Sequence, residues 1–420
     1  MTISRAVVRI RLVIKIGSDP EKVGAVLFPI FNVISFISAF IFDIRAGMLS
    51  SLIILIYVLT HKRCMVWIYD KAFVAFYLIN ILSLYAYLFN GRPFVIFLNC
   101  ITYNLLPMLM YGIGKSSISN EQNNPVFKAL IYSNIIIVLV GFIIYFVPSL
   151  AVRVGMDSMV TAGISATGKG YRFGSYLGSL ELGSICAISI PLLLMYNFKN
   201  KIVKYVTLFM FSVALLMTMQ RGAWIVGIVG IFSCAIISAV LNKKGLKIII
   251  GYSLLGIIIA AILFYFVNHY MSEGFFEHLQ IRLRGLNANS MSTGRTEQAE
   301  EAMALFLEYP LGFGLGAAGN KASSYQMGVI PDGNLIRILV ETGIFGMVAF
   351  LVLNIKAIVR GLRHKYYYMV VIILLFLAHS IGSNVLDFYY GSFIYWYILG
   401  FLNRTKEKYR LAECSSIFDH

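Results

Sequence analysis

Two arginines in this sequence stand where a permanent positive charge is costly, which suggests that both bind an anion. Arg221 lies in TMQRGAW, at the tip of a very tight connection between two hydrophobic stretches. An arginine near the centre of a membrane helix costs roughly 2.5 to 3.5 kcal/mol. A bound anion would offset that cost.

The second of these residues, Arg295, lies near the start of a helix predicted in NSMSTGRTEQAEEAMALFLEYP. We expect Ser292 or Thr293 as its N-cap and an end before Pro310. A cation in the first turn of a helix opposes the helix dipole. Free backbone amides and an arginine at one helix start suit a phosphate or pyrophosphate, so we predict an anion site to which Arg221 and Arg295 contribute.

The elements that position these arginines are membrane helices. Of the 420 residues, 59% are hydrophobic and 13% are charged, whereas about 25% are charged in soluble globular domains. Because a helix crosses the hydrocarbon with about 20 apolar residues, we predict an all-α polytopic membrane protein. The twelve expected spans are 23–42, 46–60, 72–89, 94–113, 127–148, 174–196, 205–220, 222–241, 248–268, 338–355, 366–386 and 388–402.

The basic residues of the connections predict that both termini are cytoplasmic. The inner segments then carry 24 of the 35 basic residues, 16 of them Lys and 8 Arg, whereas 9 of the 11 outer ones are Arg. Topology treats Lys and Arg alike, but a planar guanidinium holds two phosphate oxygens at once. The alternative explanation is that short outer loops tolerate Arg, whose side chain reaches the interface.

This topology divides the chain into five parts. They are a basic cytoplasmic N-terminus (1–22), nine spans (23–268), a long outer loop (269–337), three further spans (338–402) and a cytoplasmic tail (403–420). A loop of this length among minimal ones usually has a function. We expect its helix to lie on the outer membrane surface or to pack over the bundle.

Composition also excludes several classes of protein. The net charge of +16 is mostly the orientation signal, so it requires no nucleic-acid partner, and membrane lipids are the expected surroundings. The five cysteines lie in or beside predicted helices or in the tail, and no Cys or His cluster has metal-site spacing. We therefore expect no structural disulfide, no metal and no other cofactor.

Four blocks of the sequence resemble the O-antigen polymerase and O-antigen ligase superfamily of bacterial membrane glycosyltransferases. In chain order they are GYRFGSYLGSLELGSICAISIPLLL, TMQRGAWIVGIVG, STGRTEQAEEAMALFLEYPLGFGLGAAG and PDGNLIRILVETGIFGMVAFL, within residues 165–355. Each block is weak alone. Their order, their spacing and the long loop between the second and third make the joint resemblance fairly specific.

This resemblance implies a GT-C-type fold in the bacterial inner membrane, with a cavity under a periplasmic loop. It implies donors and acceptors carried on undecaprenyl pyrophosphate, inversion at the anomeric centre without a metal ion, and a chain-length regulator protein as a further candidate partner. In the ligases, arginines matching Arg221 and Arg295 contact the pyrophosphate. A histidine beside the asparagine of the fourth block activates the acceptor hydroxyl.

The chain departs from the ligase pattern in the fourth block. Where many ligases read His-Asn, it has Gly333 and Asn334 with Asp332 before them, and none of its six histidines lies near this block. The missing histidine favours a polymerase that joins lipid-linked repeat units. A ligase that transfers polysaccharide to lipid A core remains the alternative, as does a transporter or flippase, although transporters place charged sites near the midplane of both repeats.

In the polymerase interpretation, Arg221, Arg295 and Arg172 neutralise the charge that grows on the departing pyrophosphate. Asp332 and Glu181 are the candidate catalytic bases. A Pro-Asp-Gly turn explains Asp332 at least equally well. A helix-end carboxylate that pairs with Arg172 does the same for Glu181.

Other residues have weaker indications. Asn334, Arg337 and Arg284 are further candidate substrate-binding residues. Residues 388–390, FYY, suit sugar stacking, but an interfacial aromatic belt is the favoured explanation. The glycines of PLGFGLGAAG predict a turn with close backbone packing and no nucleotide-binding loop, because neither the strand context nor the P-loop Lys is present.

Overall fold

The computed structural model describes residues 20–41, 47–89, 94–121, 123–147, 173–196, 198, 200–241, 265, 293–319 and 333–404. Three predicted site residues, Asp332, Arg172 and Arg284, lie outside these ranges. For Arg295 the backbone alone is described. The predicted span 248–268 also lies outside them, apart from Tyr265.

The described part of the chain is built from helices. They are α2 (Pro20–Ile41), α3 (Gly47–Thr60), η1 (Lys62–Tyr69), α4 (Lys71–Phe89), α5 (Phe94–Cys100), η2 (Ile101–Leu105), α6 (Leu106–Met108), α7 (Met110–Lys115), α8 (Pro125–Phe146), α10 (Ser179–Met195), α11 (Lys201–Met217), α12 (Arg221–Leu241), α15 (Thr293–Glu308), α17 (Asn334–Arg363), α18 (Tyr367–Gly382), η5 (Val385–Asp387) and α19 (Tyr389–Leu402). The elements η1 and η5 are 3-10 helices, and η2 is a π-helix.

Several of these helices can cross a membrane, so the chain is a helical multi-pass membrane protein. In the described ranges, five segments are long and apolar enough: Pro20–Ile37, Phe94–Lys115, Pro125–Tyr145, Arg221–Leu241 and Asn334–Arg363. Each predicted span other than 248–268 coincides with a described helix or run of helices. The total of twelve spans stays a prediction.

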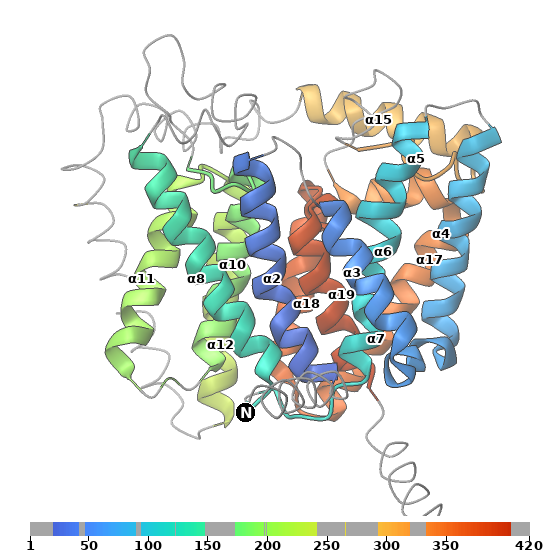
Figure 1. Ribbon diagram of the computed structural model, residues 1–420. Coiled ribbons are helices and arrows are strands. Elements are labelled where there is room, and N and C mark those ends of the chain that lie inside the picture. Colours follow the sequence, from blue (N-terminus) through green and yellow to red (C-terminus); the bar gives the residue numbers. More distant parts are fainter. Residues whose placement is uncertain are drawn as a thin grey trace, which may run out of the picture.

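The helices run side by side as one bundle with two distinct ends (Figure 1). At one end Glu21, which opens α2, accepts a hydrogen bond from the backbone N–H of Ser119 at 2.6 Å. Arg404, two residues after the end of α19, donates to the carbonyl of Ser117 at 3.3 Å. We call this the terminal end, because both ends of the described chain meet there, and the opposite one the α15 end.

A buried ion cluster fastens the terminal end. Asp70, between η1 and α4, accepts from Lys115 at 2.7 Å, from Lys356 at 2.5 Å and from the hydroxyl of Tyr111 at 2.7 Å. Burial raises the pKa of the Asp70 carboxyl, but the bonds from the two lysines outweigh it and hold the pKa below its usual range. The ionised carboxylate therefore ties α4 to α7 and α17.

The helix at the centre of the bundle is α19. All 14 of its residues are buried, as expected for a helix that is apolar on every face. Its rings pack on those of neighbouring helices: Phe393 stacks on Phe31 at 4.7 Å between centroids, and Trp396 on Phe76 at 5.8 Å. Aromatic pairs of this kind stabilise a core beyond the area they bury.

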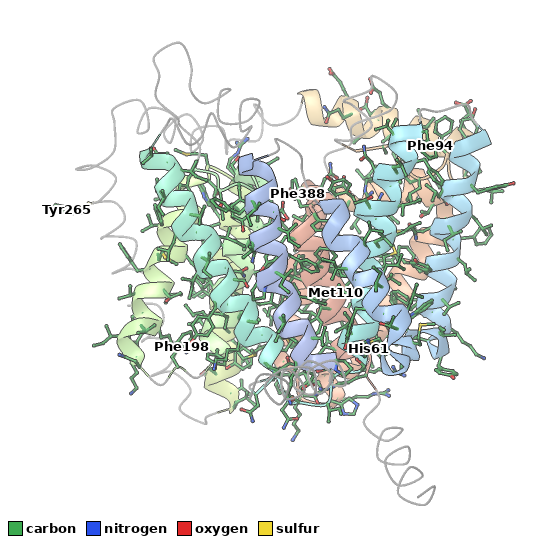
Figure 2. All side chains as sticks on the ribbon, viewed as in Figure 1. His61, Phe94, Met110, Phe198, Tyr265 and Phe388 are labelled. Carbon is green, nitrogen blue, oxygen red and sulfur yellow. The ribbon has the colours of Figure 1, made fainter. Side chains whose placement is uncertain are left out.

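The start of α19 differs from the sequence-based expectation. Tyr389 and Tyr390 are buried, so they belong to the core and form neither an interfacial belt nor an exposed sugar platform. The hydroxyl of Tyr390 donates to Asn134 Oδ1 at 2.9 Å, which satisfies the phenol inside the bundle. Phe388 is half-buried, and Figure 2 shows it near the α15 end of the bundle.

The predicted loop helix is present as α15 and lies across one end of the bundle (Figure 1). Its bounds agree with the predicted start near Thr293 and end before Pro310. Ala302 is fully buried and packs against Ala318 and Val340. The helix therefore packs over α17, one of the two positions that the sequence left open.

Candidate functional site

The connection that carries Arg221 is tightly constrained. Helix α11 ends at Met217 and α12 begins at Arg221, so only residues 218–220 join them. Met219 has a φ of 55°, a left-handed conformation that is uncommon for any residue other than glycine. Trp224 Nε1 donates to the carbonyl of Leu215 at 2.8 Å and clamps the turn across its base. Arg221 is half-buried and is the first residue of α12.

The first sequence block packs against this turn. The backbone N–H of Phe173 donates to the carbonyl of Met217 at 2.9 Å. A Cβ atom on Gly183 of α10 would lie 2.2 Å from Gln220 Oε1. A side chain at position 183 would therefore displace Gln220, so glycine is what allows the turn to lie on α10.

Gln220 reaches from the turn to a histidine that no sequence pattern selects. Its Nε2 lies 3.3 Å from Nε2 of His379, a buried residue near the end of α18. A Cβ atom on Gly222 would lie 3.4 Å from the same ring. His379 follows Gln220 by 159 positions, and neither spacing nor a motif links them.

The fourth block begins against the connection between α18 and α19. Asn334 accepts from the backbone N–H of Leu386 at 2.8 Å and donates to Asp387 Oδ1 at 3.2 Å. The N–H of Gly333 donates to Asn384 Oδ1 at 3.2 Å. Asn334, a candidate for substrate binding, is thus fully buried and engaged with η5 on both sides of its amide.

Arg337 stands at the centre of a buried ion cluster. Its Nε lies 2.8 Å from Asp387 Oδ1, and its Nη1 lies 3.1 Å from Glu341 Oε2. Nη1 also donates to Asn104 Oδ1 at 3.2 Å, from the π-helix η2. Two carboxylates face one guanidinium, so the cluster formally carries excess negative charge. In this arrangement it holds Arg337 between protein carboxylates, with α17, η5 and η2 joined around it.

Helix α17 is broken, and the third block fills the break. Gly343 has a φ of 66° and a ψ of −168° inside α17. Its neighbour Ile344 donates its N–H to Pro310, and Phe313 donates to the carbonyl of Val340, at 3.0 and 2.9 Å. Backbone groups freed inside a membrane protein must find such partners.

The stretch PLGFGLGAAG, residues 310–319, packs closely on the backbone of α17, as predicted. A Cβ atom on Gly343 would lie 2.3 Å from the backbone carbon of Leu311, and one on Gly312 would lie 2.7 Å from the carbonyl of Glu341. The backbone N–H of Gly316 donates to Glu341 Oε1 at 2.8 Å. Close backbone approach therefore joins this loop to α17, and one carboxylate serves both the loop and Arg337.

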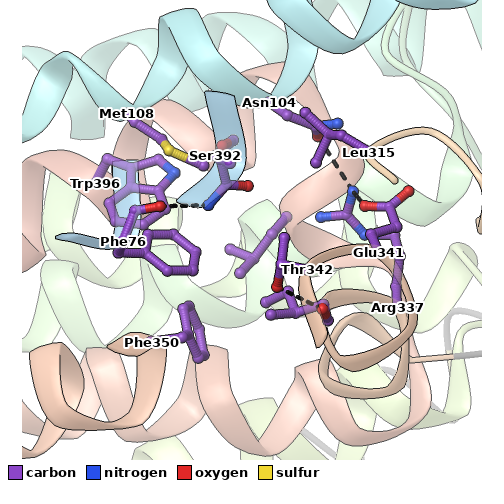
Figure 3. A pocket seen from close by; sticks show the side chains of 13 residues that line it. Phe76, Asn104, Met108, Leu315, Arg337, Glu341, Thr342, Phe350, Ser392 and Trp396 are labelled. Carbon is purple, nitrogen blue, oxygen red and sulfur yellow. Dashed lines mark hydrogen bonds and ion pairs between the residues drawn. The ribbon is translucent and has the colours of Figure 1, made fainter. Parts of the chain in front are cut away.

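A small cavity adjoins this cluster. It is lined by Phe76, Asn80, Asn104, Met108, Leu315, Arg337, Ile338, Glu341, Thr342, Phe350, Leu386, Ser392 and Trp396. The rings of Phe76, Phe350 and Trp396 lie on one side, and Arg337, Glu341 and Asn104 lie on the other (Figure 3). Its volume of about 20 Å³ is enough for a water molecule. A sugar ring would enter only if the surrounding helices moved.

Glu181, a candidate base, lies near the start of α10 and is buried. Its Oε1 accepts from the backbone N–H of Tyr390 at 2.8 Å and from that of Gly391 at 3.2 Å. These N–H groups open α19 and have no partner within that helix. Glu181 therefore caps α19 from a different helix, which stabilises the junction of α10 with the central helix.

The structure thus brings the four blocks together at the α15 end, around the ends of α18 and α19. Arg221, Glu181, Asn334 and Arg337 lie there with defined side chains, and Arg295 is the third residue of α15. The convergence of Arg221 with Arg295 and Arg172 on one anion stays a prediction. In the described ranges, no group of three or more His, Cys, Asp or Glu side chains could hold a metal ion.

Comparison with known proteins gives one match. A family model described as O-antigen ligase matches residues 206–351. This range contains the second, third and fourth blocks, and the first block precedes it. No curated protein and no solved structure matches the chain.

Proposed function

Residues 206–351 form a domain of the O-antigen polymerase and ligase superfamily, and from this premise we propose that the protein is a polymerase of surface polysaccharide. It joins repeat units carried on undecaprenyl pyrophosphate at the periplasmic face of the bacterial inner membrane. A hydroxyl of one lipid-linked unit attacks the anomeric carbon of the other chain. The new glycosidic bond forms as the bond to the pyrophosphate breaks, with inversion and without a metal ion.

The observation that supports this proposal most directly is the Arg221 turn. A half-buried arginine opens α12, where the helix dipole and the first backbone N–H groups also favour an anion. The strained Met219 and the clamped turn hold this cation in place. Preorganised positive charge at a departing pyrophosphate is commonly the largest catalytic contribution.

Arg295 and Arg172 complete the proposed pyrophosphate site. Arg295 is the third residue of α15, so it also stands at a helix start. Arg172 precedes Phe173, whose backbone is bonded to Met217 in the helix before the Arg221 turn. Both positions are consistent with three guanidinium groups around one diphosphate.

We assign the proton transfer to Asp332 in preference to Glu181. Asp332 directly precedes Gly333, whose backbone N–H is bonded to Asn384 in the α18–α19 connection. Glu181 already accepts two backbone N–H groups of α19. Undecaprenyl pyrophosphate is a good leaving group, so a weak base such as an aspartate suffices for the acceptor hydroxyl.

The other candidates take supporting parts in this proposal. Asn334 and Arg337 hold the start of α17 against η5, so they position the segment that carries Asp332. Arg284 belongs to the predicted periplasmic loop, where we propose that it contacts the saccharide or its diphosphate.

The second candidate function is that of an O-antigen ligase, because the family model carries that description. The residues Gly333 and Asn334 in place of a His-Asn pair favour the polymerase. Gene deletion separates the two. Loss of a polymerase leaves single repeat units on the lipid A core, whereas loss of a ligase leaves bare core. Loss of a flippase would leave the lipid-linked substrate on the cytoplasmic face.

The direct test uses purified protein in lipid vesicles with lipid-linked repeat units extracted from the deletion strain. Chain growth without added nucleotide or metal is the expected result. Replacing Arg221 by Ala removes one stabilising donor, so we expect the rate to fall by about 10²- to 10³-fold. Arg363→Ala is the matched control, because Arg363 is an exposed arginine at the terminal end of α17. Full activity of Arg221→Ala would contradict the pyrophosphate site.

A further inference from the structure

Two buried polar side chains directly beside Arg221 are only partly satisfied. Gln220 is 8% exposed and His379 is 3% exposed. They contact each other at 3.3 Å through Gln220 Nε2 and His379 Nε2. Gln220 Oε1 and His379 Nδ1 are buried without a hydrogen-bond partner in the described part of the chain. Buried polar groups are nearly always paired, so this pair of atoms calls for an explanation.

The hydrogen-bonding roles of the two open atoms are complementary. If the Gln220 amide donates to His379 Nε2, the ring proton lies on Nδ1, which leaves one open donor on the ring and one open acceptor on the amide. If the amide is turned over, the roles exchange. In both cases one open atom donates and the other accepts. Hydroxyl groups match both, because each can accept or donate a hydrogen bond. Since Nδ1 points away from Nε2 and from the Gln220 amide, two hydroxyl groups are needed, one for each open atom.

The surrounding backbone is arranged to keep these side chains in place. Gly183 leaves room for the Gln220 amide, and the first turn of α12 packs on the His379 ring, which lies 3.4 Å from the Cβ position of Gly222. Met219 holds a left-handed conformation directly before Gln220. Backbone strain of this kind persists only where the surroundings impose it and is concentrated at functional sites.

We propose that Gln220 and His379 each bind a hydroxyl group of the sugar attached to the pyrophosphate. The inference rests on the proposed function, because it takes Arg221 as a ligand of that pyrophosphate. The first sugar is bonded directly to the diphosphate that Arg221 is proposed to bind. Gln220 is the residue next to Arg221, so it lies beside the position of that sugar. Because the two open atoms are buried in this arrangement, binding requires the side chains packed over them to move while the Gln220–His379 contact is kept. The pair then selects lipid-linked glycosyl donors by the positions of the hydroxyl groups on this sugar.

Two isosteric substitutions separate this role from a structural one. In His379→Asn the amide places a polar atom near the position of Nδ1, which is the atom proposed to meet the sugar. In His379→Gln the amide reaches the position of Nε2 and keeps the contact with Gln220. Ser380→Ala is the matched control, because Ser380 is a buried neighbour whose hydroxyl donates to Phe376 of its own helix.

The experiment measures KM and kcat for lipid-linked repeat units extracted from the deletion strain, with each variant reconstituted in vesicles. Thermal unfolding in detergent accompanies each measurement. We expect His379→Gln and His379→Ala to raise KM by about 10-fold or more, and His379→Asn to retain most of the affinity. Ser380→Ala should resemble the wild type.

Three outcomes would overturn the inference. If His379→Gln is active and His379→Asn is not, His379 serves only to hold Gln220. If the variants lower the unfolding temperature and leave KM unchanged, the pair binds a structural water only. If Arg221→Ala is inactive while every His379 variant keeps the wild-type KM, the proposed function stands and the hydroxyl site does not. Absence of chain growth by the wild type would instead refute the proposed function.

Discussion

At the scale of single residues, Glu181 shows how a buried carboxylate that resembles a catalytic base in the sequence can have a structural task. Its bonds to the first N–H groups of α19 are favourable because a negative charge stabilises a helix start. A group engaged in this way is poorly suited to exchange protons with a substrate. This is the physical reason for placing the base at Asp332.

The substitution Glu181→Gln tests this assignment. The amide oxygen still accepts from α19, but the charge is lost, so we expect a destabilisation of about 0.3 to 2 kcal/mol and a kcat close to that of the wild type. Thermal unfolding and the vesicle assay measure the two effects. A fall in kcat of about 10²-fold or more with an unchanged unfolding temperature would make Glu181 the catalytic base.

Arg337 has the opposite relation to its surroundings, since it is a single cation between two buried carboxylates. Arg337→Met leaves Glu341 and Asp387 facing each other without compensation, and breaking such a buried pair costs about 3 to 5 kcal/mol. We expect a marked drop in the unfolding temperature. Adding Glu341→Gln should recover part of it, because one of the uncompensated charges is removed.

A double-mutant cycle on Arg337 and Glu341 measures the coupling free energy in that pair. We expect a value of about 0.5 to 3 kcal/mol, the range found for residues in one network. Additive effects of the two substitutions would show that the cluster does not hold α17 as described.

At the scale of elements, the break in α17 is the device that joins the third and fourth blocks. The loop of residues 310–319 supplies the hydrogen bonds that α17 loses at Gly343. Because a broken helix in a membrane must satisfy its backbone within the protein, the loop and the helix form one unit. Movement of the loop helix α15 would then be transmitted to the segment that carries Asn334.

The substitution Gly343→Ala tests this unit. The added methyl would lie 2.3 Å from the backbone of Leu311 at a φ of 66°, so the loop must shift away from α17. We expect a lower unfolding temperature and loss of chain growth. Gly382→Ala is the control, because no atom from another part of the described chain lies within 4 Å of its Cβ position. Equal behaviour of the two variants would show that the break does not depend on close packing.

At the scale of the whole molecule, the distribution of Lys and Arg predicts which end of the bundle faces the cytoplasm. In the described ranges, Lys115 and Lys356 lie at the terminal end, where both bind Asp70, and the α15 end carries Arg221 and Arg337. The polymerase mechanism requires the α15 end to face the periplasm, where the lipid-linked units are joined. Orientation is therefore testable independently of catalysis.

Single cysteines at exposed positions report this orientation. Leu307 in α15 is 73% exposed and Tyr69 at the terminal end is 77% exposed. In a Cys414→Ser background, we expect a membrane-impermeant maleimide to label Leu307→Cys in cells with a permeabilised outer membrane. Tyr69→Cys should react only after lysis. The reverse pattern would place the proposed pyrophosphate site on the cytoplasmic side and exclude the polymerase mechanism.

Much of the helical architecture could be predicted from the sequence. The hydropathy of contiguous residues predicted the helices of the described bundle and the tight turn at Arg221, and the N-cap and proline signals predicted the position of α15. These features are local, because an apolar stretch forms a membrane helix whatever its neighbours are. The four blocks also indicated the family, since their order and spacing are read along the chain.

The partners of the buried polar groups were decided only by the tertiary structure. Glu181 caps a helix 209 residues away, Gln220 meets His379 across 159 residues, and Arg337 meets Asn104 across 233. No local pattern encodes such pairs, because they depend on which helix faces pack together. For the same reason the tyrosines at the start of α19 resembled an interfacial belt in the sequence and proved to be core residues. Hydropathy determines that a segment enters the membrane, whereas packing determines what each of its side chains touches.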